Sequence, residues 1–219
     1  MANEIWNKRI KTAERIYEKL ENWKHSRDTI TYFFENNKEN DHFSIVLIKV
    51  VLINSLYWTQ IKKPVEIAKK IYSEHKKIDK LLNKGNLEAV NLVALSGGER
   101  YELSFASKFC HFHNKEKYPI YDKYACKALE ANLSHYKYNS QKKKCKQEYE
   151  IFSEKLREFT SKVGLDPSEF ERVDTFLWLY GMKIDLDEAK EDGALKNLKL
   201  NQEIKDFFPL HRELFRDLD

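Results

Sequence analysis

The stretch Leu103–Asp122, LSFASKFCHFHNKEKYPIYD, contains the most informative pattern in the chain. Its first half predicts a buried helix, because apolar side chains cover most of the helical surface. Polar residues in this half recur at i, i+3, i+4 and i+7, which places them in one stripe: Ser104, Ser107, Lys108 and His111. A polar stripe on a buried helix either lines a site or meets an internal partner.

The second half of this stretch ends one helix and prepares the next. Pro119 breaks the chain, and Asp122 directly precedes Lys123–Asn132, which has a helical composition. Aspartate is preferred at helix N-caps, because its carboxylate accepts hydrogen bonds from the free N–H groups of the first turn. We therefore predict that Asp122 opens a helix.

The composition predicts an all-α fold. The 219 residues include only 6 Gly and 4 Pro, so tight turns and hairpins are few, while Lys, Glu and Leu are abundant. Apolar residues make up 42% of the chain, which is enough for a real core. We expect a single helical unit of two lobes, one built from residues 1–42 and 134–219 and the other from residues 43–133.

Hydrophobic periodicity and helix-ending residues outline the remaining helices. A long amphipathic helix is expected over residues 4–24, and the most apolar helix over Phe43–Gln60. Gly85 and Gly181 are expected to end the helices before them, and Asp166-Pro167 to open another. The other expected helices cover residues 28–35, 65–72, 78–84, 87–95, 148–163, 168–180 and 207–214; residues 182–200 show no clear pattern.

Charge and cysteine content narrow the class of protein. A net charge of +4 permits nucleic-acid binding without demanding it. The cysteines form no CxxC pair, so we expect reduced thiols and no metal or other cofactor. No signal peptide is evident, and the longest apolar run, residues 45–57, is too short to span a bilayer. We therefore expect a cytoplasmic protein with no membrane partner.

Two patterns around the opening stretch suggest chemistry. Gly97-Gly98, in SGGER, precedes the buried helix, and N–H groups at a helix N-terminus suit a phosphate oxygen. An ordinary helix connection would equally use glycine. Asp122 could stabilise a developing cation, and a dehydrated Lys108 amine could act as a nucleophile. A structural ion pair with a helix cap is the alternative.

Two further patterns suggest contact with nucleic acid. Tyr57 and Trp58 could stack on a base and Gln60 could fill a gap in a duplex, although such aromatics usually finish a core. Five lysines between Lys137 and Lys146 could track phosphates, although lysine runs are more often solvated loops.

Taken in order, the motifs LINSLYWTQIKKPVEIAKKIY, LSFASKFCHFH and YPIYD resemble the helix-hairpin-helix superfamily of base-excision DNA glycosylases. Residues 43–181 carry this resemblance, and SFASKF, YPIYDK and RVDTFLWLYG bring it nearest to the 8-oxoguanine DNA glycosylase-like branch. It implies a two-lobed helical fold, a hairpin that grips the DNA backbone, and a nucleotide flipped into a cleft. LSGGER lacks the family's hairpin proline, and the family's lyase lysine would align with Arg100 or Ser104. Lys108 lies one turn beyond Ser104 on the same helical face.

The resemblance assigns roles to residues of this chain. Asp122 is the implied catalytic residue and Lys108 the candidate nucleophile. The implied base-binding residues are Tyr57, Trp58, Gln60, Ser104 and His111. The implied DNA backbone-binding residues are Gly97, Gly98, Arg100 and Lys123.

These expectations describe a DNA glycosylase-like enzyme that excises a damaged or modified base, with an 8-oxoguanine-type purine as the leading substrate and an AP-lyase step left open. Its partner would be double-stranded DNA, and it would be a cytoplasmic, nucleoid-associated monomer without a cofactor or metal. A catalytically silent DNA-binding module of a repair or defence complex is the alternative. A helical protein–protein adaptor is a third interpretation, which predicts no salt-dependent DNA binding.

Overall fold

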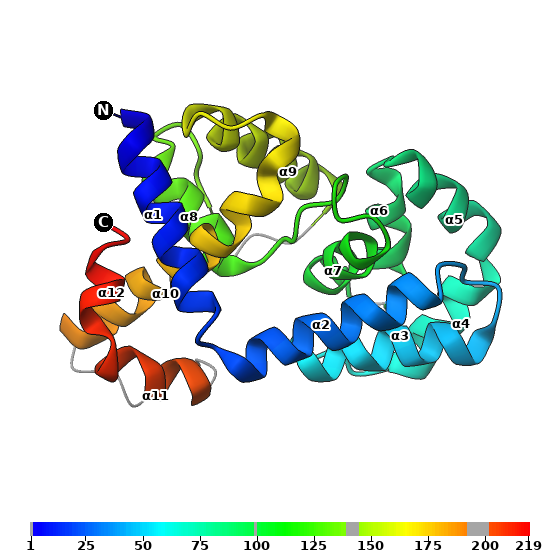
Figure 1. The fold of residues 1–219 in the computed structure, drawn as a ribbon. Helices are drawn as coiled ribbons and strands as arrows, with labels where there is room; N and C mark the ends of the chain where they lie inside the picture. Colours follow the sequence, from blue (N-terminus) through cyan, green and yellow to red (C-terminus); the bar gives the residue numbers. More distant parts are fainter. Residues whose placement is uncertain (1, 99, 139–144, 192–201) are drawn as a thin grey trace. The chain divides into compact units, whose positions relative to one another are not determined.

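The computed structural model describes residues 2–98, 100–138, 145–191 and 202–219, and these ranges are helical and contain no strand (Figure 1). The all-α prediction is therefore confirmed. The helices are α1 (Ala2–Tyr17), α2 (Glu21–Asn36), α3 (Phe43–Leu56), α4 (Pro64–Ser73), α5 (His75–Lys84), α6 (Glu88–Leu95), α7 (Leu103–His113), α8 (Lys123–Asn132), α9 (Lys146–Lys162), η1 (Pro167–Glu169), α10 (Phe170–Glu191), α11 (Gln202–Leu210) and α12 (Arg212–Arg216).

The chain forms two compact units whose boundaries differ from the lobes expected from the sequence. The first unit comprises Met1–Lys24, Asp122–Ser140 and Lys155–Asp219, and the second comprises His25–Tyr121 and Gln141–Glu154. Lys108 therefore belongs to the second unit, whereas Asp122 begins a segment of the first.

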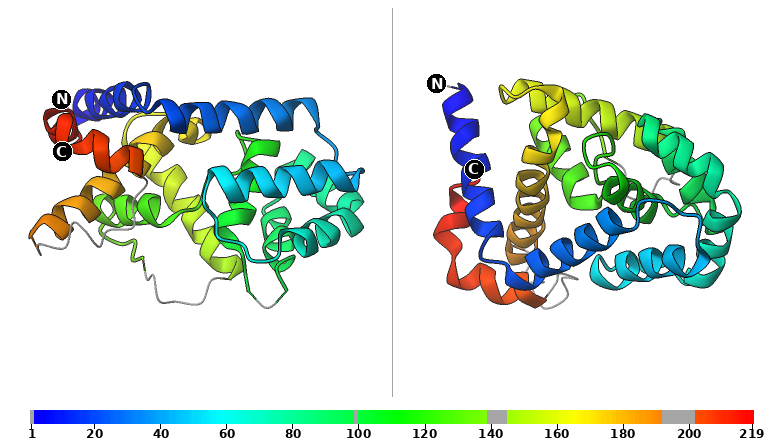
Figure 2. Two further views of the ribbon diagram at one scale, coloured as in Figure 1. Left: turned by 90° about the horizontal axis from the view of Figure 1, so that it is seen from below. Right: turned by 45° about the vertical axis from the view of Figure 1, so that its right-hand side comes forward.

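In the first unit, α10 packs against α8 and α1 (Figure 2). Gly181 lies inside α10, so its prediction as a helix end is wrong. A Cβ at this position would overlap the backbone carbonyl of Tyr124 on α8. Glycine is needed here so that the two helices can approach closely. The free-energy cost of a glycine inside a helix is smaller than the cost of moving the helices apart. Residues 182–191, for which no element was expected, continue the helix.

In the second unit, α3 packs against α4, and α6 against α7 (Figure 1). α3 ends at Leu56, four residues before the predicted Gln60. The side chain of Asn54 explains the early end, because its Oδ1 accepts hydrogen bonds from Ile61 N (3.0 Å) and Thr59 Oγ1 (3.1 Å). These bonds turn the chain back against the last turn of the helix.

Most helix boundaries with local signals follow the predictions. Gly85 ends α5 in the left-handed conformation, with φ +66°. Asp166 opens η1 with a capping box, and Pro167 occupies the first position. The expected helix over residues 4–24 is interrupted, because the chain turns between α1 and α2 to bury Leu20. The C-terminal stretch forms α11 and α12 instead of one helix.

The second unit buries the charge of Lys49, which in the sequence only interrupts an apolar run. Lys49 Nζ donates to Glu39 O (3.1 Å) and Asn40 Oδ1 (3.0 Å) and lies 3.4 Å from His113 Nε2. Asn40 is held in turn by hydrogen bonds to the carboxylate of Asp79. Burial lowers the pKa of Lys49 from 10.5 to about 8, although Asp79, Glu39 and Asp41 oppose this shift. This network fixes the loop between α2 and α3.

Replacing Gly181 by alanine is expected to destabilise the protein. An alanine normally stabilises a helix interior relative to glycine, but here its methyl group must push α8 and α10 apart, at a cost of roughly 1–3 kcal/mol. Chemical denaturation measures the free energy of unfolding. In the control Gly98→Ala, the Cβ meets open space, so only the strain of a positive φ remains, about 1 kcal/mol. An unfolding free energy of Gly181→Ala at or above that of wild type would contradict the close approach.

The pH dependence of stability is expected to report the burial of Lys49. Between pH 8 and 10.5 the unfolded chain binds this proton more tightly than the folded chain, so wild type should gain stability relative to Lys49→Met as the pH rises. The gain approaches roughly 3 kcal/mol across this window. The hydrogen bonds that Lys49→Met loses lower its free energy of unfolding by the same amount at every pH. They therefore do not affect how steeply this free energy changes with pH. The exposed Lys69→Met variant is the control, and equal slopes for all three proteins would argue against a buried Lys49 charge.

Candidate functional site

Two members of the polar stripe on α7 bind an internal partner. Ser107 Oγ accepts a hydrogen bond from Tyr121 N (3.0 Å), and His111 Nδ1 donates to Tyr118 O (2.8 Å). Burial lowers the pKa of His111 to about 3, so the ring is neutral and carries its proton on Nδ1. These bonds hold the segment that leads to Asp122. His111 therefore has a scaffolding contact in addition to its predicted role at a base.

The other two members of the stripe form a small cluster with Tyr57. Lys108 Nζ donates to Ser104 Oγ (2.8 Å) and Ser104 O (3.3 Å), and it lies 5.8 Å from the centroid of the Tyr57 ring. Lys108 is only 4% exposed. Two segments about fifty residues apart thus bring an amine, a hydroxyl and an aromatic face together within one unit. The sequence predicted each of these residues as part of a site.

The loop after α3 presents an exposed aromatic residue on a strained backbone. Trp58 is 65% exposed, so it does not finish the core, whereas Tyr57 packs edge-on against Phe112. Trp58 and Gln60 adopt positive φ values of 50° and 58°. Non-glycine residues in this region are strained and persist only where the surroundings fix them, as at many binding sites. Asn54 supplies that restraint here.

The glycine turn before α7 is occupied by an acidic side chain. A Cβ on Gly97 would lie 2.8 Å from Cγ of Glu102, and Gly98 has a φ of +75°. Burial raises the pKa of Glu102, against the effect of Arg100, whose Nε lies 3.5 Å from its carboxylate. A carboxylate beside the helix N-terminus disfavours a phosphate there. The turn therefore has the geometry of a tight helix connection, the alternative left open by the sequence.

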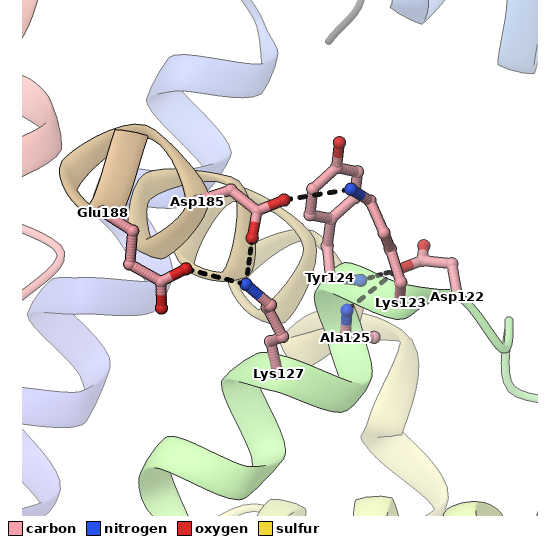
Figure 3. Close-up of polar contacts among 7 residues, drawn as sticks. All are labelled: Asp122, Lys123, Tyr124, Ala125, Lys127, Asp185 and Glu188. Carbon is pink, nitrogen blue, oxygen red and sulfur yellow. Dashed lines mark hydrogen bonds and ion pairs between the residues drawn. The ribbon is translucent and has the colours of Figure 1, made fainter. Parts of the chain in front are cut away.

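Asp122 is the N-cap of α8, as predicted. Its Oδ1 accepts hydrogen bonds from the backbone N–H groups of Tyr124 and Ala125, both at 2.8 Å. Figure 3 shows that the second carboxylate oxygen takes no part in the contacts among the residues drawn. One oxygen thus anchors the helix and the other remains directed away from it.

Lys123 is paired with an acidic residue that the sequence analysis did not identify. Its Nζ lies 3.0 Å from Asp185 Oδ2, and Lys127 contacts both Asp185 and Glu188 (Figure 3). Burial acts to raise the pKa of Asp185, but hydrogen bonds from Lys127 and Lys123 hold it below its usual value. These carboxylates compensate the charge of the two lysines. Lys123 is therefore less available to DNA phosphates than its sequence position suggested.

Part of the predicted lysine cluster also forms ion pairs. Lys146 contacts Glu88 at 2.7 Å and Lys137 contacts Glu130 at 3.6 Å, while residues 139–144 lie outside the described ranges. Within those ranges, no helix combines the length and apolar character needed to cross a membrane.

Sequence comparisons place the chain in a family. A family model described as HI_0787_N, an N-terminal domain, matches residues 8–117, which include Lys108 and the loop after α3 but not Asp122. An uncharacterized protein of Haemophilus influenzae (strain ATCC 51907 / DSM 11121 / KW20 / Rd) is 33% identical over 142 residues, or 64% of this chain and 67% of the relative. No solved structure matches significantly. The chain therefore belongs to the family that contains the HI_0787_N domain.

Proposed function

We propose that this protein is a DNA glycosylase-like enzyme that excises a damaged or modified base, foremost an 8-oxoguanine-type purine, from double-stranded DNA. The observation that carries the proposal lies in the second unit: the Lys108–Ser104–Tyr57 cluster occurs beside the strained loop that exposes Trp58. An exposed aromatic ring can stack on bases, and its contribution is on the order of 1–3 kcal/mol per base. A buried amine supplies a nucleophile for a sugar carbon.

The proposed chemistry assigns separate roles to the two charged residues. The base leaves with the electron pair of the N-glycosidic bond, and the carboxylate of Asp122 stabilises the sugar cation that develops. The Lys108 amine, in its neutral form, adds to C1′ and loses a proton. Opening of the sugar ring at O4′ then gives an imine. From that imine, loss of a C2′ proton and departure of the 3′-phosphate cleave the strand, which is the AP-lyase step; hydrolysis instead releases the abasic site and restores the amine.

A catalytically silent DNA-binding module is the second candidate function. The low exposure of Lys108 favours it, as do the ion pairs of Arg100 and Lys123, because each reduces what the residue offers to a sugar or a phosphate. The two candidates differ in turnover, and the following measurements distinguish them.

Asp122→Asn is expected to reduce base release by about 100-fold or more, the usual cost of removing an electrostatic group from a reaction centre. Asparagine is as good an N-cap as aspartate, so the stability of α8 should not change. Single-turnover release from duplexes that carry 8-oxoguanine or other damaged purines measures the rate. Asp166→Asn, at the N-cap of η1, is the matched control and should retain the wild-type rate.

Two outcomes would count against this assignment. No base release by wild type from any duplex would reject the enzyme in favour of the silent module. Equal rates for wild type and Asp122→Asn would remove Asp122 from the mechanism.

Lys108→Met is expected to abolish trapping of the protein on DNA by borohydride, because methionine has no amine that could form the reducible imine. Methionine preserves most of the buried volume, so the fold should remain intact. The exposed Lys69→Met variant should trap as wild type does. If Lys108→Met still trapped, another amine would be the nucleophile; base release by wild type without trapping would indicate a glycosylase with no lyase step.

A further inference from the structure

The outward face of α3 carries two apolar side chains at its centre that remain partly exposed. Ser44, Ile48, Val51 and Ser55 follow one another at helical spacing, form a single stripe and are all exposed. Ile48 and Val51 are each 43% exposed. The remainder of α3 is apolar on its other sides too, and such a helix is normally covered all round.

We propose that a second copy of this chain covers this stripe, with the two α3 helices antiparallel about a two-fold axis. This inference is independent of the proposed function. In a two-fold interface, if residue i of one subunit contacts residue j of its partner, residue j also contacts i of the partner. The stripe has the required symmetry: Ile48 would face the partner's Val51, and Ser44 would face the partner's Ser55. The midpoint of each pair along α3 lies between residues 49 and 50, so one two-fold axis at that point generates both contacts.

The ends of α3 carry charges that favour this orientation. The loop before α3 contains the exposed acidic residues Glu39 and Asp41 beside Lys38. The loop after it contains the exposed Lys62 and Lys63, of which Lys63 pairs with Glu66 at 3.5 Å, so this end keeps a net positive charge. An antiparallel arrangement places a net negative end beside a net positive end at both edges of the interface. A parallel arrangement would place like charges together, which is unfavourable.

The pattern favours a second copy over an unrelated partner. A helix or peptide of another protein would require an apolar stripe but would give no reason for β-branched residues and serines to be distributed symmetrically on α3. Serines at both ends also leave room for the helices to approach closely, and Ile48 with Val51 supplies the desolvated centre. The proposed dimer differs from the monomer expected from the sequence, and the measurement below decides between the two.

Sedimentation velocity of the full chain tests this proposal. Over roughly 1–100 μM, the range of moderate dimer affinities, wild type should sediment as a dimer and Val51→Lys as a monomer whose circular dichroism shows the wild-type helical content. Val65→Lys is the matched control, because Val65 is 46% exposed on α4 and outside the stripe; it should remain dimeric. A monomeric wild type, or a Val51→Lys variant as dimeric as wild type, would overturn the proposal.

A second variant tests the orientation. Lys62→Glu combined with Lys63→Glu should raise the dimer dissociation constant at least fivefold at low salt, and this effect should largely disappear near 1 M salt, where the screening length is about 3 Å. An unchanged dissociation constant at low salt would overturn the antiparallel arrangement.

Discussion

The close approach of α8 and α10 determines which charged side chains are paired in the first unit. Gly181 lets the two backbones meet at Tyr124, and Asp185 lies one turn further along the same face of α10. This spacing places the carboxylate of Asp185 against Lys123 and Lys127. A wider spacing would leave both lysines without a buried counter-charge. The packing at one glycine thus decides how much positive charge the start of α8 presents.

Each unit compensates its buried charge in a different way. Asp185 is paired with two ammonium groups, and these contacts outweigh the cost of burial. Lys49 relies mainly on neutral acceptors, three of them on the loop before α3, and its pKa falls because they do not fully replace water. Asp185 contacts Lys123, which is 62 residues away, and Lys49 contacts His113, which is 64 residues away, as well as the loop just before α3. The contacts of these buried charges therefore specify which helices and loops pack against one another. They also contribute to stability.

Features set by neighbouring residues were predictable from the sequence, and features set by tertiary contacts were not. Asp122 and Asp166 were correctly identified as helix caps because their acceptors bind N–H groups two or three residues away. Gly181 was misread because its reason is a contact with α8. The pairing of Lys123 with Asp185, 62 residues away, left no local signal. The roles of Lys108 and Asp122 in catalysis remain predictions, since geometry alone does not report turnover.

The amide of Asn54 has a consequence for how the loop at residues 57–63 can evolve. The path of this loop is fixed by hydrogen bonds from the Thr59 hydroxyl and the Ile61 N–H to the Asn54 amide in the last turn of α3, and the side chain at position 58 makes neither of these bonds. Relatives that retain this amide are free to exchange the residue displayed at position 58 while inheriting the same frame. A substitution at this single exposed position can thus change what the surface displays without remodelling the scaffold beneath it.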